Sequence, residues 1–348
     1  MLETYAQVQD CAREERIPFD VMVELTYGCN LRCAHCYNAP DGSQREISAE
    51  EFAGILGQIA AAGGFMLTFT GGEALTRPDF FEIAARAKRL GYAMSLISNG
   101  TLITDDVADR LAALHFADVS VTLYSTDPET HDSITRTPGS QRATVGAIER
   151  LRSRGIKVSM RSVIMRKNFQ GYEALIRFAE ERGIRYLIDP NVSVRQDGDR
   201  SPLKYQLDAE SMVPIYADRR INFSLEGFPR EDSPQPDCDA GRSICSVDPY
   251  GNLYPCIQLP IKFGNMLEEP FDRIWNESEE ARRLRGINRR QMAECLGCKL
   301  SGYCMRCTGV AYLEGHGLVG RSDSACATAK IMAGLVENEG AERTGKRS

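Results

Sequence analysis

The sequence contains no apolar run that approaches the roughly 20 residues of a membrane-spanning helix. Its first residues, MLETYAQVQD, have neither the basic start nor the apolar stretch of a secretory signal. Positive charge is not in excess either, since 42 Lys and Arg face 48 Asp and Glu and the net charge is −6. This balance gives no sign of a nucleic-acid or membrane surface. We therefore expect a cytoplasmic protein whose cysteines are reduced.

Cysteine is missing from the whole middle of the chain, between residues 37 and 237. Cys29, Cys33 and Cys36 form a C-x3-C-x2-C triplet near the start, and Cys11 stands apart. The other eight crowd the last third: Cys238, Cys245, Cys256, Cys295, Cys298, Cys304, Cys307 and Cys326. A chain of 348 residues can bury its own core, so we do not expect the disulfide framework of a short secreted domain.

The number of cysteines in each group favours iron–sulfur clusters over zinc. Cluster iron is usually held by four thiolates, so three leave one iron open to another ligand, whereas eight are enough to close two clusters. Zinc is the alternative, because Cys295-x2-Cys298 and Cys304-x2-Cys307 have the spacing of a zinc ribbon. Zinc does not account for the triplet, which would need a fourth ligand from elsewhere.

Short apolar runs alternate with amphipathic helical stretches through the first two thirds of the chain. Six of these runs are predicted strands: Phe19–Leu25, Phe65–Thr70, Ala93–Ile97, Asp118–Leu123, Lys157–Met165 and Arg185–Asp189. The stretches between them, one of which begins with a capping box at Ser48 and Glu51, predict helices that cover a parallel sheet. About 200 residues is short for a complete eight-stranded barrel, so we predict an α/β fold with a partial, TIM-like (β/α)6 barrel. Its functional loops should follow the strands, and the cysteine triplet follows the first one.

The character of the sequence changes after this region. Residues Arg195–Lys204 are polar and turn-rich, and Pro229–Asp239 combines three prolines with several acids, so we interpret both as a connection to a second domain. We expect metal ligation, more than a large apolar core, to organise that domain. The predicted divisions are an N-terminal segment 1–18, a core 19–215, an auxiliary domain 216–335 and a charged tail 336–348.

Four motifs at predicted strand ends resemble those of the radical S-adenosylmethionine (SAM) superfamily. The first is CNLRCAHC at residues 29–36, which resembles the signature loop of that superfamily. GGE at residues 71–73 resembles its GGE motif, and SNGT at residues 98–101 resembles its ribose-binding region. HDSI at residues 131–134, with GS at 139–140, is similar to a stretch in peptide-modifying members.

The last third resembles the SPASM extension, which carries two auxiliary [4Fe-4S] clusters. The matching pattern is Gly251-x4-Cys256, then Cys295-x2-Cys298-x5-Cys304, then a later cysteine. The departure is Cys304-x2-Cys307, in which two residues separate the cysteines where the common pattern has three. The resemblance implies that the first auxiliary cluster is bound by Cys238, Cys245, Cys256 and Cys307. It implies that the second is bound by Cys295, Cys298, Cys304 and Cys326.

The same resemblance implies a reaction. The triplet would bind a third [4Fe-4S] cluster, whose open iron chelates the amino and carboxylate groups of SAM, a co-substrate. One electron then cleaves SAM to a 5′-deoxyadenosyl radical, which abstracts a hydrogen atom from the substrate. The implied SAM-binding residues are Gly71, Gly72, Glu73, Ser98, Asn99, Arg136 and Arg161. The alternatives are a plain turn at the glycines, an Asx-type turn at Ser98 and Asn99, and surface ion pairs for the arginines.

Four further residues lie at or beyond predicted strand ends and could position substrate or accept a proton. They are Asp189, Arg195, Tyr124 and Asp197. For each of them, an ordinary solvated loop residue is the alternative.

The resemblance implies an oxidoreductase that crosslinks or otherwise oxidises a ribosomally made peptide. The chain lacks the longer N-terminal recognition domain of many such enzymes, so a separate recognition protein or the cavity itself would hold the peptide. A low-potential donor such as flavodoxin or ferredoxin would supply the electron. The alternative is a dehydrogenase or epimerase of a sugar or aminocyclitol. In an epimerase a free thiol, Cys245 or Cys11, would return hydrogen to the substrate.

Overall fold

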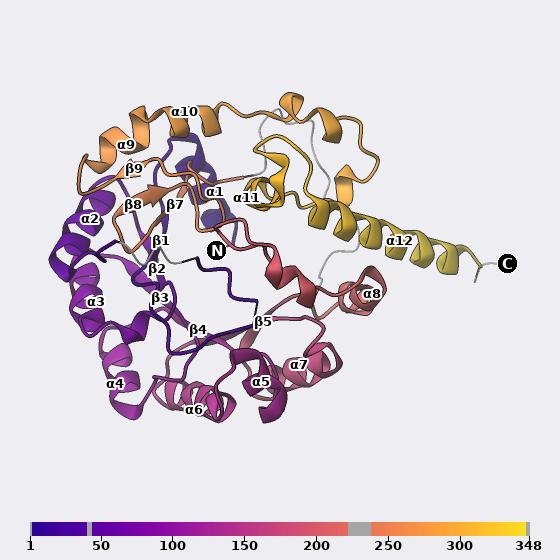
Figure 1. Cartoon of the computed structure of the whole chain (residues 1–348), viewed down its shortest axis with the longest axis horizontal. Helices are drawn as coiled ribbons and strands as arrows, with labels where there is room; N and C mark the ends of the chain where they lie inside the picture. The colour runs from indigo at the N-terminus through magenta and orange to yellow at the C-terminus, as the bar shows by residue number, and fades with distance from the viewer. Residues whose placement is uncertain (1, 40–43, 222–237, 346–348) are drawn as a thin grey trace.

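Figure 1 shows a curved sheet surrounded by helices in the computed structural model, which describes residues 2–39, 44–221 and 238–345. Six parallel strands form the first part of this sheet, and each is hydrogen-bonded to the next strand along the chain. They are β1 Asp20–Glu24, β2 Met66–Thr70, β3 Ala93–Ser98, β4 Asp118–Thr122, β5 Val158–Val163 and β6 Arg185–Asp189. This order confirms the predicted α/β fold with a partial (β/α)6 barrel.

Helices connect the successive strands and form the outer layer of the barrel (Figure 1). They are α2 Ala49–Ala61, α3 Phe80–Arg89, α4 Asp105–Ala113, α5 Pro128–Thr135, α6 Ser140–Ser153 and α7 Tyr172–Glu181. The capping box predicted at the start of α2 is present. The backbone N–H of Glu51 donates to Ser48 Oγ at 3.2 Å, and the backbone N–H of Ser48 donates to Glu51 Oε2 at 2.7 Å. Helix α5 was not predicted.

Side chains on the strands alternate between the helix layer and the inside of the barrel. On β1, Val21 and Val23 are fully buried in an apolar cluster with Phe52 and Leu56 of α2. Glu24, at the end of the same strand, instead faces a cavity inside the barrel. The alternation therefore stabilises the outer layer with apolar contacts and leaves the polar side chains of the strands for the interior.

The C-terminal third continues the same sheet. Strand β7, Ile244–Val247, lies parallel to β1 on the side opposite β2, and β8 Asn252–Tyr254 and β9 Gly264–Asn265 follow as antiparallel strands. The large apolar core extends into this third, where we had expected metal ligation, more than such a core, to organise the domain. Trp275 stacks on Phe271 at 5.5 Å in helix α9, Phe271–Glu277, and both side chains are 2% exposed or less.

Further helices complete the described chain. They are α1 Leu2–Glu14, α8 Ala209–Ala217, α10 Glu279–Arg285, α11 Thr308–Ala311 and α12 Asp323–Gly345. The predicted division after residue 215 lies within α8. Of the predicted connection, residues 195–204 are described, whereas residues 229–237 lie outside the described residues. The divisions themselves stay predictions. Helix α12 continues through most of the predicted tail.

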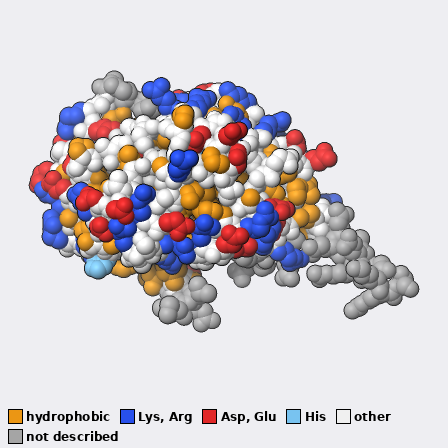
Figure 2. All heavy atoms as spheres, turned by 90° about the horizontal axis from the view of Figure 1, so that it is seen from below, with side chains coloured by type: hydrophobic (Ala, Val, Ile, Leu, Met, Phe, Trp, Pro, Cys, Tyr) orange, Lys and Arg blue, Asp and Glu red, His pale blue; other side chains and the backbone are white. Residues whose placement is uncertain are grey.

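The surface carries no large region of one charge on the face seen in Figure 2, where basic and acidic side chains are interspersed. Within residues 2–39, 44–221 and 238–345, no helix combines the length and apolar character needed to cross a bilayer.

Candidate cluster and cofactor site

The loop after β1 carries the cysteine triplet and is held by the end of α5. The backbone N–H of Arg32 donates to Thr135 O at 3.1 Å, and that of Ala34 donates to Ile134 O at 2.8 Å. Within the loop, the N–H of Leu31 points at Cys29 Sγ from 3.4 Å. Backbone contacts therefore fix a loop that contains no regular secondary structure.

The three thiols of the triplet are close enough to influence one another. Burial raises the pKa of Cys33 to about 12, and the neighbouring Cys36 and Cys29 raise it further. Burial also raises the pKa of Cys29, with smaller contributions from Glu73 and Cys36. No three ligands in the described part of the chain are close enough to hold a single metal ion. Three thiolates are a donor set that fits an iron–sulfur cluster with one iron left open to another ligand.

The glycine pair after β2 packs against the cysteine loop. Gly72 N donates to Thr26 O at 2.7 Å, and a Cβ atom at Gly72 would clash with the carbonyl oxygen of Gly28. Gly71 has a φ of +125°, and a Cβ there would clash with Thr26 O. Two backbone segments can approach this closely only without side chains. Both glycines are thus needed to seat the cysteine loop, whatever ligand they also contact.

Glu73 joins the two SAM-related motifs. It is 1% exposed and accepts hydrogen bonds from Ser98 Oγ at 3.0 Å, from the backbone N–H of Asn99 at 2.8 Å and from that of Leu75 at 3.2 Å. Burial raises the pKa of Glu73, and these hydrogen bonds oppose the rise. Ser98 and Asn99 are therefore brought together with Glu73, as the resemblance implied, beside the cysteine loop.

Asn99 reaches the cysteine loop directly. Its Nδ2 donates to Asn30 Oδ1 at 2.9 Å and lies 4.0 Å from Cys29 Sγ. Its Oδ1 accepts hydrogen bonds from the backbone N–H and the hydroxyl of Thr101, which is the Asx-type turn that we considered as an alternative. The turn and a contact with a bound ligand are compatible, because the turn sets the direction of the amide.

The two predicted arginines lie on different elements, Arg136 at the end of α5 and Arg161 on β5. Arg136 has a left-handed backbone conformation at the end of α5 and interacts with Tyr205. Arg161 lies on β5, where its Nε donates to Ser120 Oγ at 2.7 Å, and its surroundings include Tyr37. Burial lowers the pKa of Arg161. Asp118 is the acidic neighbour that influences Arg161.

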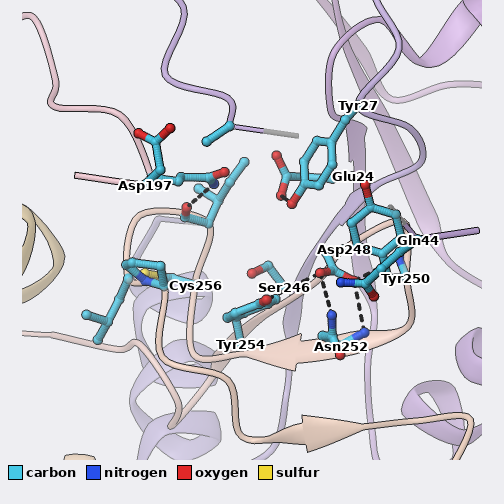
Figure 3. A pocket seen from close by; sticks show the side chains of 15 residues that line it. Glu24, Tyr27, Gln44, Asp197, Ser246, Asp248, Tyr250, Asn252, Tyr254 and Cys256 are labelled. Carbon is cyan, nitrogen blue, oxygen red and sulfur yellow. Dashed lines mark hydrogen bonds between the residues drawn. The ribbon is translucent and has the colours of Figure 1, made fainter. Parts of the chain in front are cut away.

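A polar cavity of about 200 Å³ lies where β1 and β7 end, as Figure 3 shows. Its wall combines the barrel with the C-terminal third: Glu24 and Tyr27 come from β1 and the loop after it, whereas Asp248, Tyr254 and Cys256 follow β7. Lys, Arg and His are absent among its described lining residues. The cavity is therefore suited to a group that donates hydrogen bonds.

Glu24 is the least satisfied polar group of this cavity. It is 3% exposed, and its Oε2 accepts from the Tyr27 hydroxyl at 3.2 Å. Its Oε1 has no partner within hydrogen-bond distance among the described residues, although Gln196 is close enough to lower the pKa of the carboxyl. Burial, with a smaller contribution from Asp248, raises this pKa to about 8. We did not predict this residue. The available signal was an acid inside an apolar strand, five residues before the first cysteine of the triplet.

The candidate substrate residues are only partly brought together. Asp197 lines the polar cavity, and Arg195 lies beside it with its Nη2 3.2 Å from Asp197 Oδ2. Asp189 accepts hydrogen bonds from the backbone N–H and side chain of Asn191, and burial raises its pKa. Tyr124 lies by the triplet, close to Cys33, with its ring 4.9 Å from that of His35. Neither Asp189 nor Arg195 is part of the described cavity wall.

Six of the C-terminal cysteines form two groups in the last third. Burial raises the pKa of Cys256 to about 12, and Cys238 and Cys307 raise it further. Burial raises the pKa of Cys326, to which Cys295 and Cys298 add. Cys304 directly follows the short turn Ser301–Tyr303 and lies between Cys298 and Cys307 in sequence. The two groups correspond to six members of the interleaved ligand sets, and the sets themselves stay a prediction.

Cys245 does not join either group, in contrast to the predicted ligand set. It lies on β7, is fully buried in the apolar core, and has Asp20 and Tyr92 as titratable neighbours. Cys11 is exposed on α1. Cys245 lies apart from both groups because side chains alternate along β7. This alternation directs the Cys245 thiol into the helix layer and away from the cavity.

The fold and site define a class of protein. A model of the radical SAM superfamily matches residues 23–179, and one of the SPASM iron–sulfur cluster-binding domain matches residues 238–299. The chain is also 30% identical to the mycofactocin maturase MftC of Mycolicibacterium smegmatis, over 77% of this chain and 72% of that protein. The chain therefore belongs to the radical SAM superfamily, and it is a radical SAM enzyme of the SPASM type.

Two further relatives have different names. The AdoMet-dependent heme synthase of Methanosarcina barkeri is 29% identical, over 83% of this chain and 90% of that protein. The PqqA peptide cyclase of Ruegeria pomeroyi is 27% identical, over 95% of both chains. Among solved structures, SuiB of Streptococcus suis bound to S-adenosylmethionine shares the fold, with a TM-score of 0.71 at 19% identity over 93% of this chain and 81% of that chain.

Proposed function

We propose that this protein is an oxidoreductase that abstracts a hydrogen atom from a ribosomally made peptide and leaves the peptide oxidised, for example by a crosslink. The observation that carries the proposal is the position of the polar cavity between the two cysteine regions. Tyr27, two residues before Cys29, lines the same cavity as Cys256 of the C-terminal third. A maturase and a peptide cyclase among the relatives support a peptide as substrate.

Three [4Fe-4S] clusters fit the cysteine groups. Cys29, Cys33 and Cys36 would hold the one that binds SAM, and the C-terminal cysteines would hold two auxiliary clusters. Bound cluster and SAM together supply a carbon-centred radical that removes hydrogen, which is chemistry that the cofactors and not the side chains perform. Cys256, which lines the cavity, would hold an auxiliary cluster there, and that cluster would supply the electron acceptor that oxidation of the substrate requires.

The chain's own residues orient the reactants and hold protons. Glu73 fixes Ser98 and Asn99 beside the triplet, where they can contact SAM. Glu24 is neutral at pH 7, because its pKa is raised to about 8, so its Oε1 can either donate or accept a hydrogen bond in the cavity. This suits a peptide, whose backbone offers both N–H and C=O groups.

The partners follow from the same chemistry. A low-potential donor such as flavodoxin or ferredoxin would deliver the electron, and a separate recognition protein could present the peptide. We place the enzyme in the cytoplasm, where thiols stay reduced.

Two other substrates compete with a peptide. A precursor of heme is favoured by the heme synthase, which this chain resembles over 90% of that protein's length. A sugar or aminocyclitol is the weaker alternative: its epimerisation would need a thiol in the cavity, and Cys245 faces away from it.

Anaerobic reconstitution with iron and sulfide tests the proposed reaction. After reduction with dithionite, the protein should convert SAM into 5′-deoxyadenosine, measured by liquid chromatography. Replacement of Cys29, Cys33 and Cys36 by alanine should abolish this product, whereas Cys11→Ala, on the exposed face of α1, should not change it. Absence of 5′-deoxyadenosine from the reconstituted wild-type protein would rule the proposal out.

Mass spectrometry then distinguishes between the candidate substrates. Peptides encoded beside the gene should lose two hydrogen atoms per turnover, and a heme precursor or sugar supplied in parallel should remain unchanged. Conversion of the heme precursor alone would overturn the peptide assignment while leaving the radical chemistry intact.

A further inference from the structure

Two buried carboxyl groups lie side by side where β1 and β7 end. Val23 of β1 is paired in register with Val247 of β7, and Glu24 and Asp248 are the residues that follow them. Neighbouring strands are about 4.8 Å apart, and residues in register point to the same face of a sheet. Glu24 and Asp248 accordingly both line the polar cavity, as Figure 3 shows. The fold therefore places two acidic side chains next to each other inside the barrel.

The carboxyl group of Asp248 is occupied by its own hairpin. Its Oδ1 accepts hydrogen bonds from the backbone N–H of Tyr250 and from that of Asn252, both at 2.9 Å. Its Oδ2 accepts from Asn252 Nδ2 at 2.8 Å and from the Tyr254 hydroxyl at 3.3 Å. A carboxylate can accept about four hydrogen bonds, so Asp248 adds negative charge to the cavity and has no acceptor site left for a ligand.

Glu24, in contrast, keeps one oxygen for a ligand. Its Oε2 accepts from the Tyr27 hydroxyl, whereas its Oε1 has no partner within hydrogen-bond distance among the described residues. The neighbouring Gln196 uses its Nε2 to donate to Ile257 O at 3.2 Å. A buried acceptor without a partner is unfavourable, so a donor group held at Glu24 Oε1 would stabilise the folded protein.

The negative charge of this pair is not balanced by the cavity wall. Lys, Arg and His are absent among its described lining residues. Arg195, which lies beside the cavity, is paired with Asp197 at 3.2 Å and with Asp199 at 3.9 Å. Like charges on adjacent strands repel each other, and a positively charged ligand group would relieve this repulsion.

The single free oxygen indicates which cation fits. A guanidinium prefers two carboxylate oxygens at once, and Oε2 of Glu24 is already bonded to Tyr27. A metal ion needs several ligands, and the described part of the chain has no three Asp, Glu, Cys or His side chains placed to share one. A primary ammonium group is compact and has three donors. Oxygens of Ser246 and Gln196 on the same wall are available to its other two hydrogen bonds.

We propose that this cavity binds a primary ammonium group of the substrate, with Glu24 as its carboxylate partner and Asp248 as a second negative charge. The inference rests on the proposed function and deepens it, because it names the group by which the substrate is held. A lysine side chain supplies the ammonium in a peptide, and an amino group supplies it in a sugar. Tyr27, the partner of Glu24, lies two residues before Cys29, so a substrate held here is beside the cysteine loop.

Saturation-transfer NMR with the reconstituted protein tests the binding. The peptide probes are Nα-acetyllysine amide and Nα-acetyl-6-hydroxynorleucine amide, which has a hydroxyl in place of the ammonium; the sugar probes are glucosamine and glucose. At about pH 7.5 the amine of at least one pair should bind about tenfold more tightly than its neutral counterpart. Equal binding within both pairs, or binding of no probe, would overturn the proposal.

The two pairs also distinguish the sources of the ammonium group. Preference for glucosamine alone would keep the ammonium site and assign it to a sugar, against the proposed peptide. No SAM is cleaved in this measurement, so its outcome is independent of the test for 5′-deoxyadenosine.

A matched pair of variants tests the role of Glu24. Glu24→Gln keeps the volume of the side chain and removes its charge, and it should reduce the preference for the amine by about tenfold. Asp197→Asn also changes a carboxylate of the cavity wall, but one whose Oδ2 is paired with Arg195. This control should alter the preference by less than about threefold. An equal loss in both variants, or a loss in neither, would show that Glu24 is not the partner.

The pH profile of the wild-type protein needs no variant. The pKa of Glu24 is about 8 without a cation beside it, so the ammonium group must displace a proton from the carboxyl. Affinity for the lysine probe should therefore rise by up to about tenfold per pH unit between about pH 6 and 7.5. Tyr27, Asp248 and Gln196 face Glu24, and the profile of Glu24→Gln measures what they contribute. A wild-type profile as flat as that of Glu24→Gln would contradict the proposal.

Discussion

The two cysteine regions are built in different ways. The triplet sits on a loop of the barrel, whose strands and helices surround it and whose backbone hydrogen bonds to α5 fix it. The C-terminal segment 288–307 instead consists of three short turns, Arg289–Gln291, Ala293–Cys295 and Ser301–Tyr303. Two large apolar side chains of this segment are exposed to solvent: Leu296 is 56% exposed and Met305 is 70% exposed.

This difference indicates which interactions stabilise the folded state of each region. The barrel buries a continuous apolar core, so we expect its cysteine loop to be positioned without a cluster. The C-terminal segment buries little, and ligation can supply the missing free energy, as it does in small metal-binding domains. We therefore expect one site to be formed before a cluster binds and the other to be completed by cluster binding.

Removal of iron should produce the largest difference between the two regions, measured as amide hydrogen exchange. Chelation should raise amide hydrogen exchange in residues 288–307 by at least about tenfold, because local stability there depends on ligation. Exchange in β1–β6 should change by less than about twofold, since the apolar core of the barrel remains. Hydrogen exchange of the holoprotein and the chelated protein checks this. Equal loss of protection in both regions would mean that the barrel also depends on its cluster.

Gly72→Ala tests whether the cysteine loop is seated by backbone packing. The new Cβ would clash with Gly28 O, and we expect a loss of about 2–3 kcal/mol in the free energy of unfolding, measured with denaturant. Gly54→Ala in α2 is the matched control. It meets no atom within 4 Å and should stabilise the protein by about 0.5–1 kcal/mol. A neutral Gly72→Ala would indicate that the loop can move away.

The raised pKa of Glu24 makes the free energy of unfolding depend on pH. Its pKa rises from 4.5 to about 8 on folding, so the folded chain binds more protons than the unfolded chain between these values. Stability from this group is complete below 4.5 and is lost as pH rises towards about 8. Glu24→Gln should remove this loss, which amounts to at most about 1.4 kcal/mol per pH unit.

Denaturant unfolding at about pH 6 and about pH 7.5 measures the effect. The wild-type protein should lose more stability between the two values than Glu24→Gln. Parallel slopes for the two proteins would place the pKa of Glu24 outside this window.

The smallest expected effect on stability comes from the cap of helix α2, in the helix layer outside the barrel. Ser48→Ala removes the side chain that caps α2 and should lower the free energy of unfolding by about 1 kcal/mol. Ser153→Ala, at the exposed end of α6, should change it by less than about 0.5 kcal/mol. Thermal unfolding of the reconstituted protein compares them. SAM cleavage should be unaffected by either change, and a loss on Ser48→Ala would connect α2 to the site.

Sequence patterns predicted the barrel well because its strands and helices have strong periods. Strand β6 was predicted with its observed ends, and the Ser48 capping box was found from two residues. Helix α5 was missed because PETHDSIT offers only His131, Ile134 and Thr135 as buried residues, too few for a helical stripe.

The site was predicted less completely, since spacing counts cysteines but does not tell which face of a strand they occupy. Cys245 belongs to the short apolar run ICSV, in which a strand period of two would have placed it with Val247 in the core. Glu24 was missed because a single acid in an apolar strand looks like an interruption of the apolar pattern and not like part of a site. Only the pairing of β1 with β7, more than two hundred residues apart in sequence, turns it into part of a cavity.

That pairing also has a consequence for how the protein is made. Asp20 pairs with Ile244, so the partner of β1 leaves the ribosome 224 residues later (244 − 20). At about 5–20 residues per second, β1 waits about 10 to 45 s with one edge unpaired. An unpaired strand edge is where foreign strands attach, and Glu24 and the adjoining cysteine loop lie at its end. Slow synthesis or a truncated C-terminal third should therefore favour aggregation through β1, which chaperones would have to cover until β7 arrives.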